Sequence, residues 1–134
     1  MELRIVTKNP EIDTVPYYEL FINYKNQYIE FDDINEKRWK IEFKTVQAWK
    51  VTAFDCINLE LLDTNETVDE KGINHHYILE VVNSHWIKEL EKELYSRDKN
   101  ATFFEKSHHY ILPLGDEIIE VIAWDNYKLE QIVQ

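Results

Sequence analysis

Hydrophobic and polar residues alternate along several short stretches of this chain, which is typical of β-strands with one buried face. The clearest stretch is Arg38–Phe43, where Trp39, Ile41 and Phe43 fall on one side and charged residues on the other. Similar β-branched and aromatic runs recur, with residues that favour turns between them. The strands predicted in this way span residues 2–6, 18–24, 27–31, 38–43, 47–54, 75–82, 102–104, 109–114 and 117–124, and 57–62 is predicted to continue the sheet.

The periodicity changes after residue 82, where apolar residues recur every three or four positions, as in a helix with one apolar face. Asn83 and Ser84 precede this stretch, and both residue types cap helix N-termini because their side chains accept backbone N–H groups. We therefore predict a helix over residues 84–97, anchored by Trp86, Leu90 and Leu94.

Together these elements predict an α+β fold: a mainly antiparallel, strongly curved or two-layered sheet with one main helix, about 84–97, packed on it. The stretch 117–124 is apolar on both faces, which predicts an interior strand covered on both sides. Residues 63–74 are polar and include Gly72, so we expect a mobile loop there. Three tryptophans lie on apolar stripes and are predicted to be core residues: Trp39, Trp49 and Trp86.

Length and composition bound the class of protein. The 134 residues suit a single domain, 1–134, and a chain of this size buries enough surface to fold without a metal or a disulfide. The chain has no apolar run long enough to span a membrane as a helix, and its N-terminus lacks the pattern of a signal peptide. Cys56 is the single cysteine, which excludes an intramolecular disulfide and suits a reducing compartment. We therefore expect a cytoplasmic protein.

The net charge of −11 bears on the choice of partner. Such a surface repels nucleic acids and anionic membranes and attracts basic proteins. Between residues 51 and 70 the chain has six acidic residues and no Lys or Arg. This segment is either a solubilising surface or a docking face for a basic protein. In the second interpretation, the candidate partner-binding residues are Asp63, Glu66, Asp69 and Glu70, with Tyr18 and Trp124 as aromatic anchors.

The histidines offer an alternative chemistry. The string His-His-Tyr-Ile-Leu occurs at 75–79 and at 108–112, so two neighbouring strands could present imidazoles of His75, His76, His108 and His109 to a metal ion. Neighbouring residues of a strand point to opposite faces, however, and the histidines lack typical ligand spacing. We predict no metal and no cofactor. A metal-dependent or carboxylate-based hydrolase stays open as the enzymatic alternative, and a subunit that dimerises by strand pairing as the structural one.

Three segments together resemble a known group of proteins. They are a strand that ends in Ala48-Trp49, the helix opening Asn83-Ser84-His85-Trp86, and HHYILPLGDEIIEVIA at 108–123. Over residues 27–124 this arrangement is similar to a loose group of small uncharacterised bacterial cytoplasmic proteins, some encoded beside secreted polymorphic toxins and thought to be immunity proteins. The resemblance implies toxin binding and assigns no residue role. We therefore expect a non-enzymatic protein that binds another protein, such as an immunity protein that blocks a basic toxin, for example a nuclease.

Overall fold

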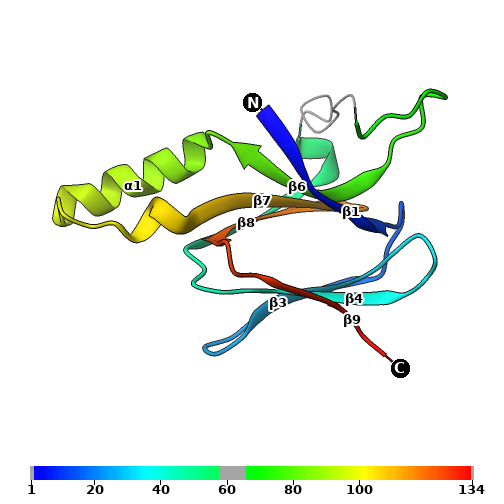
Figure 1. The fold of residues 1–134 in the computed structure, drawn as a ribbon, viewed down its shortest axis with the longest axis horizontal. Helices are drawn as coiled ribbons and strands as arrows, with labels where there is room; N and C mark the ends of the chain where they lie inside the picture. The colour runs from blue at the N-terminus through cyan, green and yellow to red at the C-terminus, as the bar shows by residue number, and fades with distance from the viewer. Residues whose placement is uncertain (1, 58–65, 134) are drawn as a thin grey trace.

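The computed structural model describes residues 2–57 and 66–133, and in them the chain forms two antiparallel sheets and one helix (Figure 1). This confirms the α+β class and the two-layered, antiparallel sheet predicted from the alternating pattern. In chain order, the elements are β1 (Glu2–Ile12), β2 (Tyr18–Ile22), β3 (Gln27–Asp32), β4 (Arg38–Phe43), β5 (Ala48–Ala53), the 3-10 turn η1 (Phe54–Cys56), β6 (His76–Val82), α1 (His85–Arg97), the 3-10 turn η3 (Phe103–Lys106), β7 (Ser107–Leu114), β8 (Glu117–Trp124) and β9 (Lys128–Gln131).

The larger sheet has the strand order β1-β6-β7-β8-β5, and the smaller one has the order β2-β3-β4-β9. Figure 1 shows the two sheets as layers, with β3, β4 and β9 below β7 and β8. A tight turn at Gly115 (φ +75°) joins β7 to β8, whose pairing runs from Leu114↔Glu117 to Ser107↔Trp124. This register fixes which side chains of the two strands lie on the same face.

The main core lies between the sheets, because alternate residues of their strands point into the space that the two layers enclose. Its buried members are Ile12, Ile29, Phe31, Ile41, Phe43, Ile78, Tyr110, Leu112, Leu114, Ile119, Val121 and Ala123. A second buried cluster on the outer face of the larger sheet comprises Tyr77, Leu79, Val81, Ile111 and Ile118. The interior position of β8 and its burial on both faces are thereby confirmed.

The helix follows β6 through a sharp turn, in which Asn83 has a positive φ of 55°. Ser84 caps the helix as predicted: its side-chain oxygen accepts the backbone N–H of Ile87 at 3.1 Å. Figure 1 shows α1 projecting beyond the end of the larger sheet, and its closest strand is β7. The predicted anchors Trp86, Leu90 and Leu94 are half-buried, and the helix has no fully buried residue. Its contribution to the core is therefore small.

The structure corrects three predicted elements. β1 continues through Pro10 to Ile12, because β1 is an edge strand, where a proline without a donor N–H is tolerated. Residues 102–104 do not form a strand: the N–H of Glu105 bonds to the carbonyl of Thr102, which closes the turn η3. β9 is an additional strand that pairs with β4.

Two further predictions can be compared only in part. Of the predicted continuation 57–62 and the loop 63–74, residues 58–65 lie outside the described residues, and 66–74 form turns with an isolated bridge between Val68 and Asn74. Trp39 and Trp49 pack against the main core and are half-buried.

In residues 2–57 and 66–133, none of the helical structure is long and apolar enough to cross a membrane.

Candidate functional site

A hollow opens beside each end of α1. The first, which we call the helix-start pocket, has a volume of about 490 Å³ and is lined by residues that include Lys50, Ser84, Trp86, His109 and Glu120. The second, the helix-end hollow, has a volume of about 680 Å³ and is lined by residues that include Leu94, Asp98, Phe103, Glu105 and Trp124. Both volumes fall in the range of roughly 300–1,000 Å³ that is typical of ligand sites.

The helix-start pocket contains a chain of three hydrogen-bonded side chains from three elements. Ser84 Oγ lies 2.7 Å from Nδ1 of His109, and Nε2 of the same ring lies 2.8 Å from Oε1 of Glu120. Residue 109 pairs with 122 and residue 111 with 120, so the β7–β8 register places His109 and Glu120 diagonally on one face of the sheet. Ser84 and His109 are 4% and 5% exposed, so this contact is shielded from water.

The direction of these hydrogen bonds follows from the chemistry of the groups. An ionised carboxylate only accepts, so a neutral ring at residue 109 donates its Nε2–H to Glu120 and leaves Nδ1 as an acceptor. The hydroxyl of Ser84 then donates to Nδ1, while its oxygen accepts the N–H of Ile87. The serine oxygen is therefore polarised from two sides.

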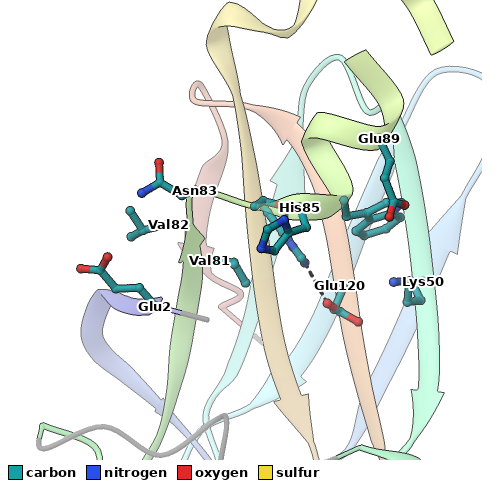
Figure 2. A pocket seen from close by; sticks show the side chains of 11 residues that line it. Glu2, Lys50, Val81, Val82, Asn83, His85, Glu89 and Glu120 are labelled. Carbon is teal, nitrogen blue, oxygen red and sulfur yellow. Dashed lines mark hydrogen bonds and ion pairs between the residues drawn. The ribbon is translucent and has the colours of Figure 1, made fainter. Parts of the chain in front are cut away.

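The aromatic ring of Trp86 borders this chain of hydrogen bonds. It contacts the ring of His109 edge to face, with 5.2 Å between centroids, and Lys50 Nζ lies 4.3 Å from the centre of the indole. Figure 2 shows Lys50 and Glu89 on one side of the pocket and Glu2 on the other, with Glu120 between them in this view. The pocket therefore combines an aromatic wall with charged groups of both signs.

The helix-end hollow exposes aromatic surface. Phe103 is 44% exposed, and its ring lies 5.6 Å from that of Trp124 between centroids. The indole N–H of Trp124 donates to the carbonyl of Phe103 at 3.0 Å, which fixes the two rings relative to each other. The carboxylates of Asp98 and Glu105 line the same hollow. Trp124, which the sequence indicated as an anchor, is thus half-buried beside an exposed aromatic residue and acidic groups.

Tyr18, the second predicted anchor, lies between the two sheets, where its side chain has contacts within the protein. Its side chain is half-buried against the main core, and its hydroxyl donates to a carboxylate oxygen of Glu117. Burial, together with the hydrogen bond to Glu117, raises the pKa of Tyr18 to about 12. This contact joins the smaller sheet to the larger one.

The predicted acidic face is described only in part, because Asp63 lies outside the described residues. Glu66 and Glu70 are exposed, whereas Asp69 is half-buried and accepts the N–H groups of Lys71 and Ile73. Figure 1 shows residues 66–74 at the opposite end of the molecule from η3, which adjoins Trp124. The structure therefore does not bring Glu66, Asp69 and Glu70 together with Trp124 on one surface.

The repeated histidine string leads to separate local pairs rather than to one cluster. His75 lies 3.0 Å from carboxylate oxygens of both Glu11 and Asp69, and these hydrogen bonds raise its pKa. His108 pairs with Glu80, which also binds Arg4. Within residues 2–57 and 66–133, no group of three or more His, Cys, Asp and Glu side chains is arranged to hold a metal ion.

The chain of Ser84, His109 and Glu120 was not predicted, although part of its signal is present in the sequence. A hairpin that turns at Gly115 places His109 and Glu120 on one face of neighbouring strands. The approach of Ser84 to His109 could not be predicted from the sequence, because it depends on where the turn after β6 places the start of α1 relative to β7.

Comparisons with protein-family models, with curated proteins and with solved structures give no significant match.

Proposed function

We propose that this chain is a cytoplasmic protein-binding domain whose partner is a basic protein, as expected for an immunity protein that blocks a basic toxin such as a nuclease. The observation that carries the proposal is the helix-end hollow, where Phe103 is 44% exposed beside Trp124. Exposed aromatic residues in a concave site are typical of the residues that supply most of the energy of a protein interface.

The charge of the chain supports a basic partner. The net charge of −11 accelerates the encounter with a positively charged surface, and Asp98 and Glu105 provide carboxylates beside the two rings. Lys106 Nζ lies 5.3 Å from the ring centre of Trp124, which indicates that this face already accommodates a cationic group. A lysine or arginine of the partner would meet the same combination of ring and carboxylate.

The test takes as partner a basic protein chosen from those encoded by neighbouring genes and measures association and dissociation rates. We expect Trp124→Ala or Phe103→Ala to accelerate dissociation by roughly 30-fold or more, the equivalent of a hot-spot residue. Tyr24→Ala is the matched control, because Tyr24 is an aromatic residue that is 97% exposed in the turn between β2 and β3. Equal dissociation rates for all three variants and the parent protein would exclude the helix-end hollow as the interface.

A further inference from the structure

We propose that Ser84 is an activated nucleophile and that the helix-start pocket takes up the acyl group of a small carboxylic ester. This inference goes beyond protein binding and concerns the other end of α1. It rests on the chain of contacts from Ser84 through His109 to Glu120, with 2.7 Å and 2.8 Å between the bonded atoms. Serine, histidine and a carboxylate in this order activate a hydroxyl for acyl transfer, and here Nδ1 faces the serine and Nε2 the carboxylate, the reverse of the assignment in the known serine proteases.

The environment of each group fits its role. His109 is 5% exposed, so water does not compete with Ser84 for Nδ1. The N–H of Ile87 occupies one lone pair of Ser84 Oγ and the proton is directed to His109, which leaves the second lone pair for a carbonyl carbon. Glu120 holds the ring in the tautomer that accepts a proton at Nδ1 and stabilises the positive charge that then develops.

The position of Ser84 in the chain supplies donors for the oxyanion. Ser84 stands between a strand and a helix, as the nucleophile does in many serine hydrolases. The backbone N–H groups of His85 and Trp86 belong to the first turn of α1, where an α-helix offers them no carbonyl. These N–H groups and the positive end of the helix dipole can stabilise negative charge that forms next to Ser84.

The reaction balances without a further reactant except water. Ser84 Oγ forms a bond to the carbonyl carbon of the ester while its proton moves to Nδ1 of His109, and the carbonyl electron pair moves to oxygen. When this pair returns, the bond to the alkoxy group breaks, and the alcohol leaves with the proton from His109. Water then attacks the acyl-serine, gives a proton to His109 and releases the carboxylic acid as Ser84 regains that proton.

The pocket indicates the class of ester. Its volume of about 490 Å³ admits a small molecule, and Trp86 offers an aromatic wall to an apolar acyl or alcohol group. Lys50 is opposite Glu120 in the β5–β8 register and reaches over the indole. A small uncharged ester fits these surroundings, because a carboxylate on the ligand would meet Glu120 and an ammonium group would meet Lys50.

The experiment treats the whole chain with a fluorophosphonate that labels activated serines, and with p-nitrophenyl acetate, and identifies the modified residue by peptide mass spectrometry. We expect both reagents to modify Ser84. Ser84→Asp keeps a helix-capping side chain and should lose the label, and His109→Gln should slow labelling by at least about 100-fold. Ser96→Ala, which removes an exposed hydroxyl of the same helix, should label at the parent rate.

Glu120 is a positioning residue in this scheme and has its own readout. In Glu120→Gln we expect the limiting rate of labelling to fall by roughly 10²–10⁴-fold, while the reagent concentration that gives half of this rate stays unchanged. Circular dichroism verifies that each variant folds. If Ser84→Asp does not fold, His109→Gln and Glu120→Gln decide the question.

Two results would overturn the proposal: no label on Ser84 in the parent protein, or labelling of Ser84 at the parent rate in His109→Gln. Either would leave the three side chains with a structural role only. The outcome is independent of the proposed protein binding, because the helix-start pocket and the helix-end hollow share no lining residue.

Discussion

Nε2 of His75 lies 3.0 Å from Oδ2 of Asp69, and the opposite nitrogen of the same ring lies 3.0 Å from Glu11. One imidazole thus joins the turn that precedes β6 to the edge strand β1. The hydrogen bonds with Glu11 and Asp69 raise the pKa of His75, and hydrogen bonds from the Ile73 backbone and from His75 lower that of Asp69. These shifts make the contact sensitive to pH.

We expect the stabilisation due to His75 to be complete below its ordinary pKa of 6.5 and to disappear as the pH rises through the higher pKa of the folded state. For Asp69 the sign is opposite: its stabilisation is present above the ordinary pKa of 3.8 and disappears as the pH falls through the lowered one. Urea unfolding of the parent and of His75→Gln should therefore differ most between about pH 4 and 6.5. A difference that grows above pH 8 would contradict this assignment.

A second expectation concerns Glu80, which is 8% exposed between Arg4 and His108. Burial alone would raise its pKa, but the hydrogen bonds from Arg4 and His108 outweigh this effect and lower it. We expect Glu80→Gln to reduce the free energy of unfolding by about 1–3 kcal/mol near neutral pH, at the lower end because the Arg4 side chain is 61% exposed.

The effect of Glu80→Gln should shrink as the pH falls below 4.5, where the unfolded chain protonates first. Glu130→Gln serves as the control, because Glu130 lies 3.6 Å from Lys128 in an exposed pair. That variant should stay within about 0.5 kcal/mol of the parent protein. Similar losses for both variants would mean that the burial of Glu80 has no special effect.

A comparison of two leucines separates the core from the helix. Leu112 is fully buried between the sheets, whereas Leu90 on α1 is half-buried. We expect Leu112→Ala to lower the free energy of unfolding by about 2–5 kcal/mol, and Leu90→Ala by about 1 kcal/mol. Both values come from urea unfolding. A loss for Leu90→Ala as large as that for Leu112→Ala would show that α1 packs more tightly than its exposure indicates.

The acidic segment can be tested by the kinetics of partner binding. Replacing Glu66 and Glu70 by Gln removes two exposed charges and spares Asp69, whose carboxylate holds the turn. If this segment guides the encounter, association slows at low salt and depends less on salt, while dissociation is unchanged. In the control variant Glu93 and Glu130, which are exposed on α1 and β9, are replaced by Gln, so that the two double variants have the same net charge. Equal association rates for the two double variants would assign the effect to net charge alone.

Local pattern was sufficient for a strand with one buried face and for an interior strand that is buried on both. The predicted bounds of β4 agree with the structure residue for residue, since Trp39, Ile41 and Phe43 alternate with charged side chains. The bounds of β8 agree as well, because its apolar residues are buried on both faces of an interior strand. In these stretches the requirement to bury apolar side chains is enough to select the structure.

Local pattern was insufficient where pairing with a distant strand determines whether a segment forms a strand. β9 contains three charged or amide side chains in four residues, and its backbone bonds to β4 hold it in place. The same limit applies to the helix-start pocket. The sequence marked Ser84 as a cap and His109 as a strand residue, but their contact bridges 25 positions and depends on the turn at Asn83.

The strand order also has a consequence for synthesis on the ribosome. β1 pairs with β6 from Glu2↔Val82 to Ile12↔His76, so its hydrogen-bonding partners are made 80 to 64 residues later. At about 5–20 residues per second, β1 waits on the order of 3–16 s before these partners are translated. During that interval a nascent chain exposes an unpaired strand, and Lys8 and Pro10 are among the residues within it that discourage pairing with other chains.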